Sequence, residues 1–99
     1  MTGFISEKDI ESYFAGQIKR LGGKAFKFVS PGTAGVPDRL VLLPGGRMCF
    51  CELKAPGKKA RPLQLRQHDR IRALGFSVFV CDSKEQVDYM LDWLRGGDF

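Results

Sequence analysis

Residues 35–54, GVPDRLVLLPGGRMCFCELK, contain two apolar runs separated by Pro-Gly-Gly, and this stretch restricts the fold more than any other. Each run has the length and composition of a β-strand, and the residues between them are typical of a hairpin turn. Charged residues lie at the outer ends of the runs, Asp38 on one and Glu52 and Lys54 on the other. Charges beside apolar sequence cost desolvation free energy, so we expect a compensating interaction there.

The length of the turn determines which of these side chains meet. A two-residue Gly-Gly turn would place Asp38 opposite Leu53, with Glu52 facing the other way. A three-residue Pro-Gly-Gly loop, with proline first and Gly46 in the left-handed conformation, pairs Asp38 with Glu52. Lys54 then shares their face because strand side chains alternate. We favour the three-residue loop because its residue types suit these positions.

The rest of the chain alternates between helical and strand patterns. Ser6 is a typical N-cap residue, and Ile10, Phe14 and Ile18 recur at helical spacing after it. The expected elements are a helix (6–23), three strands (24–30, 38–43 and 47–54), a helix (62–75), a strand (76–81) and a helix (83–96). This order predicts an α/β fold with a mixed sheet, and the apolar hairpin strands predict a sheet that is covered on both sides.

Length and composition favour one globular domain, residues 1–99. No apolar run approaches the length of a membrane span. The N-terminal segment carries acidic residues where a signal peptide would have a positive start, so we expect a soluble intracellular protein. The 16 Lys and Arg residues, with a net charge of +5, favour a polyanionic partner but do not by themselves establish nucleic-acid binding.

The three cysteines and the one histidine suggest no metal centre of their own. Cys49 and Cys51 alternate within one strand and point to one face, and with Cys81 we interpret them as small buried apolar residues. A zinc site would need four suitably spaced ligands, and the sequence offers none. His68 lies in a charged helical segment, which predicts a surface position.

The convergence of Asp38 and Glu52 indicates a chemistry. Two carboxylates on one face repel each other unless a cation lies between them. Mg²⁺ or Mn²⁺ would relieve this repulsion, and the main-chain carbonyl of Leu53 could add an oxygen ligand. Such an ion activates water and neutralises charge on a phosphate, and Lys54 could hold the attacking water or stabilise the transition state. This combination favours phosphodiester hydrolysis, although Asp38 capping its loop and Glu52 simply pairing with Lys54 would give the same pattern.

Three stretches also resemble a known family. The "PD" at 37–38 and the "ELK" at 52–54 resemble the PD-(D/E)XK nuclease signature. Residues 27–46, 51–64 and 74–88 resemble one branch, the VRR-NUC (virus-type replication-repair nuclease) domain. This resemblance implies a restriction-endonuclease-like αβββαβ(α) core, in which helices flank a central mixed sheet. It also implies a divalent metal, Mg²⁺ or Mn²⁺, and a DNA substrate.

The resemblance assigns roles to the charged residues named above. It implies that Asp38 and Glu52 are metal ligands and that Lys54 is the catalytic lysine. The branch also has a glutamate on its first helix, which Glu11 fits best and which could reach the metal through a water. Glu7, one helical turn away, is the alternative.

The resemblance extends to the segment after the hairpin. Gln64 matches a glutamine of the branch that would orient a water or phosphate, and Gln67 lies close enough to be an alternative. Lys58, Lys59 and Arg61 follow the "ELK" and could contact DNA phosphates. Any one of these three could equally belong to a solvated loop.

Small stand-alone phage-type members of the branch are similar to Holliday-junction resolvases that act as homodimers. We therefore expect a metal-dependent, structure-selective DNA endonuclease that cuts Holliday junctions or other branched DNA as a homodimer. It would act in the cytoplasm of a bacterial or phage-infected cell, without membrane association. The alternative is a non-catalytic DNA-binding module of the same fold, and a weaker one is a partner-binding adaptor that uses the last helix.

Overall fold

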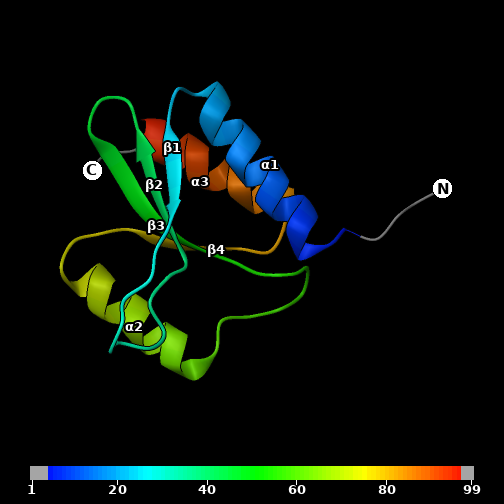
Figure 1. Ribbon diagram of the computed structural model, residues 1–99. Coiled ribbons are helices and arrows are strands. Elements are labelled where there is room, and N and C mark those ends of the chain that lie inside the picture. The colour runs from blue at the N-terminus through cyan, green and yellow to red at the C-terminus, as the bar shows by residue number, and fades with distance from the viewer. Residues whose placement is uncertain (1–4, 97–99) are drawn as a thin grey trace.

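The computed structural model describes residues 5–96, which form three helices and four strands (Figure 1). The elements are α1 (Glu7–Arg20), β1 (Lys24–Lys27), β2 (Arg39–Leu43), β3 (Arg47–Leu53), α2 (Pro62–Ala73), β4 (Val78–Cys81) and α3 (Lys84–Gly96). Their order confirms the α/β fold that the sequence predicts. None of the helices in this range is both long and apolar enough to cross a bilayer.

Helix α1 begins where its sequence predicts. The Ser6 hydroxyl accepts a hydrogen bond from the main-chain N–H of Asp9 (3.1 Å), and the Asp9 carboxylate accepts one from the main-chain N–H of Ser6 (2.8 Å). This reciprocal capping box satisfies two amides that the helix itself leaves unpaired. The stripe of Ile10, Phe14 and Ile18 is buried, so one face of α1 is fixed against the sheet.

The four strands form one mixed sheet in the order β1-β2-β3-β4. The pairs β1–β2 and β2–β3 are antiparallel, whereas β3 and β4 are parallel and are connected through α2. Leu43 pairs with Arg47 and Leu40 with Phe50, which confirms the three-residue loop. Both loop glycines adopt positive φ, 87° at Gly45 and 75° at Gly46, a conformation that glycine allows without steric cost.

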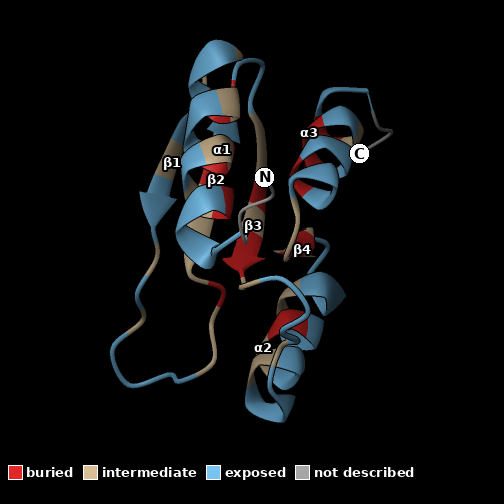
Figure 2. Ribbon diagram, turned by 90° about the vertical axis from the view of Figure 1, so that its right-hand side faces the viewer, coloured by how far each residue is buried: buried red, intermediate tan, exposed pale blue. Residues whose placement is uncertain are grey.

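The core lies between one face of the sheet and the two helices α1 and α3, as the red segments of Figure 2 show. Alternate residues of β2 and β3 point into it because strand side chains alternate between faces. The buried side chains are Ile10, Phe14, Ile18, Val41, Leu43, Cys49, Cys51, Leu53, Cys81, Val87, Met90, Leu91 and Leu94. The three cysteines are thus buried and free, as predicted, and burial raises the pKa of the Cys49 thiol to about 12.

The opposite face of the sheet is only partly covered, which corrects the prediction of a sheet covered on both sides. Helix α2 packs against β4. Over β1 and β2, Phe26 and Leu42 remain 47% and 38% exposed. Phe28 packs on Phe50 with ring centroids 5.4 Å apart and shields part of this face. The apolar composition of the hairpin could not reveal this opening, because an apolar strand face can be covered by a helix or by another chain.

Candidate active site

The loop between β1 and β2 is pressed against the start of α2, and this contact brings the residues of the site together. Gly35 has φ +92°, and a Cβ atom there would lie 2.9 Å from the main-chain oxygen of Leu63. Only glycine fits this approach without strain. Pro37 is buried two residues later, so the chain enters β2 at a defined place beside the first turn of α2.

Asp38 is the residue before β2, and its side chain is tied to the neighbouring strand. Its Oδ1 accepts a hydrogen bond from the main-chain N–H of Leu53 (3.2 Å), and its Oδ2 lies 3.3 Å from Nη1 of Arg39. Burial raises the pKa of the Asp38 carboxyl above its ordinary value, while the Leu53 amide and the Arg39 guanidinium act in the opposite direction. These contacts hold the Asp38 carboxylate in place, but they do not fully offset the cost of burying its negative charge.

Glu52 lies on β3, and only 5% of its surface is exposed. The Gln64 amide donates a hydrogen bond to its Oε2 (3.2 Å), and the Lys54 ammonium lies 3.7 Å from the same oxygen. Burial raises the pKa of the Glu52 carboxyl, and the negative charge of Asp38 raises it further, whereas Lys54 lowers it. Within residues 5–96, Oε1 has no hydrogen-bond partner.

These two carboxylates have the chemistry of a divalent-cation site. The charge of Asp38 disfavours the ionised form of Glu52. A cation bound by both carboxylates would relieve this repulsion. Across the described range no group of three His, Cys, Asp or Glu side chains could hold a metal ion. The residues fit Mg²⁺ or Mn²⁺, because such ions bind through one or two carboxylates and keep several waters.

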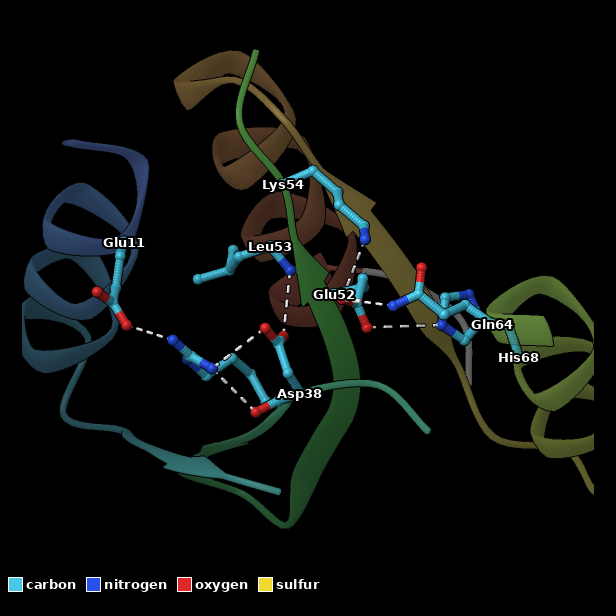
Figure 3. A network of polar contacts seen from close by, with 8 residues as sticks. Glu11, Asp38, Glu52, Leu53, Lys54, Gln64 and His68 are labelled. Carbon is cyan, nitrogen blue, oxygen red and sulfur yellow. Dashed lines mark hydrogen bonds and ion pairs between the residues drawn. The ribbon is translucent and has the colours of Figure 1, made fainter. Parts of the chain in front are cut away.

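The first-helix glutamate takes a different position from that of the other two acids. The Glu11 carboxylate on α1 pairs with the guanidinium of Arg39, which also contacts the carboxylate and the carbonyl of Asp38. Figure 3 shows Asp38 between Glu11 and Glu52. Glu11 thus joins the network through Arg39, while Glu7 is exposed. Sequence reasoning missed Arg39, although its position directly after Asp38 was a usable signal.

Gln64 lies in the first turn of α2 and contacts Glu52. Its side-chain oxygen accepts a hydrogen bond from the main-chain N–H of Arg61 (2.8 Å), while its NH₂ group donates to Glu52. One amide therefore both caps the helix and fixes the carboxylate. The role expected for it, orientation of a water or phosphate, would use the second N–H of the same group.

His68 is completely buried, which corrects the prediction of a surface position. It lies four residues after Gln64 and hence on the same face of α2. Its Nε2 is 3.9 Å from Oε1 of Glu52 (Figure 3). Burial lowers the pKa of His68, and the nearby charge of Arg72 lowers it further. The Gln-x-x-x-His spacing was the sequence signal that could have placed His68 at the site.

The three basic residues predicted to contact DNA lie on the surface. Lys58 and Lys59 are exposed in the loop after β3, and Arg61 is exposed directly before α2. The loop is anchored where the main-chain N–H of Gly57 donates to the Asp82 carboxylate (3.1 Å). The basic side chains are thus carried by the segment that connects Lys54 to Gln64.

Comparison with known proteins agrees with this geometry. No family model matches the chain. Over 81 residues, 82% of its length, it is 53% identical to the "Putative nuclease p44" of Acyrthosiphon pisum secondary endosymbiont phage 1, of which it covers 87%. A solved structure described as "VRR_NUC domain" superposes with a TM-score of 0.81 at 39% identity, over 87% of this chain and 94% of that one. The fold is therefore shared with a VRR_NUC domain, and the chain belongs to the VRR-NUC family.

Proposed function

We propose that this chain is a Mg²⁺- or Mn²⁺-dependent endonuclease that hydrolyses phosphodiester bonds in DNA, with residues 1–99 forming one nuclease domain. The observation that carries the proposal is the buried Glu52 carboxylate, which lies beside Asp38, Lys54 and Gln64. A buried acid with a raised pKa and a charged partner is typical of a functional site.

Asp38 and Glu52 would hold the divalent ion. The main-chain carbonyl of Leu53 and Glu11, through a water, would supply further oxygen atoms. When bound, such an ion acidifies a water molecule and neutralises the charge that develops on the scissile phosphate. Arg39 would fix the relative position of the Glu11 and Asp38 carboxylates through its ion pairs to both.

Lys54 would act directly on the reacting groups. Its ammonium is held 3.7 Å from Glu52 and is mostly shielded from solvent, with 14% of the side chain exposed. A shielded ammonium with remaining N–H donors can hold the attacking water or stabilise the phosphate oxygens in the transition state. Gln64 would orient that water or a phosphate oxygen while it holds Glu52.

Lys58, Lys59 and Arg61 would bind phosphates next to the scissile one. Phosphate contacts position a duplex without reading its bases, so selectivity would come from DNA shape. The proposed substrate is therefore branched DNA, such as a Holliday junction. The proposed place of action is the cytoplasm of a bacterial or phage-infected cell.

A homodimer would suit such a substrate. The exposed apolar side chains of Phe26 and Leu42 on the uncovered sheet face offer a surface on which a second copy could pack. A two-fold dimer carries two identical sites and could cut two strands of a junction that has near two-fold symmetry.

The test is cleavage of labelled linear, nicked, flap and four-way DNA with Mg²⁺ or Mn²⁺, with and without a chelator. We expect metal-dependent products, most from branched DNA. We expect Asp38→Asn and Lys54→Ala to cut at least about 10²-fold more slowly while binding DNA as before. Lys19→Ala, an exposed lysine on α1, is the matched control.

Two results would contradict the proposal. Unchanged cutting by Asp38→Asn or Lys54→Ala would remove these residues from the reaction. Binding of DNA by the wild-type chain with no products in either metal would point instead to a non-catalytic DNA-binding module.

A further inference from the structure

Three polar atoms in the buried part of the site have no hydrogen-bond partner within residues 5–96. They are Oε1 of Glu52 and both ring nitrogens of His68. Nε2 and Oε1 face each other at 3.9 Å, outside the usual hydrogen-bond range of about 2.7–3.2 Å. Buried polar atoms nearly always have partners, so two unpaired groups this close together call for an explanation.

Packing alone does not explain a histidine at this place. His68 is the one buried residue of α2, and an apolar side chain would fill the same volume without burying two unpaired nitrogens. The neighbouring carboxylate is held from one side only. Gln64 and Lys54 both contact Oε2 of Glu52, while Oε1 faces the imidazole. A carboxylate held at only one oxygen is less firmly oriented than one held at both.

We propose that His68 is a positioning residue that donates a hydrogen bond from Nε2 to Oε1 of Glu52 and so fixes this carboxylate for the divalent ion. The inference rests on the proposed function, in which Glu52 binds the metal. To form this bond, Nε2 and Oε1 must approach by about 0.7 Å, from 3.9 Å to the upper limit of about 3.2 Å for an N–H···O bond. Carboxylates that bind metals are normally held in this way by a second layer of residues.

The surroundings of the ring suit this role. A neutral imidazole carries one ring proton, on either Nδ1 or Nε2. Since Nδ1 has no partner in the described structure, nothing there competes for that proton, and it can reside on Nε2.

The experiment measures Mn²⁺ binding to the full chain without DNA, by isothermal titration calorimetry at neutral pH. We expect His68→Leu, which keeps the volume but removes the donor, to weaken Mn²⁺ binding about 10–100-fold. His68→Gln, whose amide N–H can replace Nε2–H, should stay within about threefold of the wild type. Arg70→Gln, an exposed position on the same helix, is the matched control and should not change the affinity.

Thermal melting of each variant separates loss of the hydrogen bond from loss of the fold. If His68→Leu does not fold, His68→Asn replaces it, because its shorter amide cannot reach Oε1 and should bind Mn²⁺ as weakly as predicted for leucine. A folded His68→Leu or His68→Asn with wild-type affinity would overturn this inference alone. Equal weakening by His68→Gln and the shorter or apolar variant would also overturn it. Failure of the wild-type chain to bind Mn²⁺ would overturn the proposed metal dependence, and this inference with it.

Discussion

Replacing Glu52 by glutamine removes the charge at the centre of the site while keeping its shape. The carboxylate is almost completely buried, and both its burial and the charge of Asp38 raise its pKa. A pKa that is higher in the folded than in the unfolded state means that folding disfavours the ionised form. Stability is therefore lost as the pH rises from the ordinary pKa through the raised one, and the full loss is present above the raised pKa. Glu52→Gln removes this loss, so the variant should be more stable than the wild type without metal.

The size of the effect follows from linkage. Each unit by which a pKa is raised corresponds to about 1.4 kcal/mol. We expect a gain on the order of 1 kcal/mol, since the glutamine oxygen can still accept the hydrogen bond from Gln64. In a domain of this length, 1 kcal/mol moves Tm by roughly 4–8 °C. Divalent metal should reverse the order of the two proteins, because an ion present at a hundred times its Kd would stabilise the wild type by about 2.7 kcal/mol.

The assay is thermal unfolding followed by circular dichroism at neutral pH, first with a chelator and then with excess Mn²⁺. Glu52→Gln should melt above the wild type in chelator and below it in Mn²⁺. Asp92→Asn, which changes an exposed acid on α3, is the control and should follow the wild type in both. A variant that melts below the wild type in chelator would refute the electrostatic reasoning. An equal rise of both proteins in Mn²⁺ would show that Glu52 is not a ligand.

Two further predictions concern the loops around the site. Gly35→Ala should destabilise the fold by about 1–3 kcal/mol in urea unfolding, through strain at φ +92° and a clash with Leu63. Gly32→Ala, with φ +85° and no neighbour within 4 Å, is its control, and an equal or larger loss there would exclude the clash as the cause. Replacing both Lys58 and Lys59 by alanine should reduce the slope of log binding constant against log salt by about two, equally for linear and branched DNA. Fluorescence anisotropy at several salt concentrations measures this slope, which must stay unchanged if the lysines do not contact phosphates.

Local sequence was enough to predict the elements and the hairpin. Ser6 and the spacing of Ile10, Phe14 and Ile18 depend on neighbours within one helix, so the start of α1 and its buried face followed directly. The Pro-Gly-Gly loop determined the register of β2 and β3 for the same reason: turn geometry is local. These local rules, together with the resemblance to VRR-NUC nucleases, predicted that Asp38, Glu52 and Lys54 lie together.

What the sequence by itself determined is thus the order of the elements, the register of the hairpin and the family. Only the tertiary structure decided which side chains from separate elements meet. It buried His68 beside Glu52, joined Glu11 to Asp38 through Arg39, and left one sheet face partly open. The physical reason is that hydrogen-bonded turns and helix caps depend on residues a few positions apart, whereas burial depends on how α1, α2 and the sheet pack against one another.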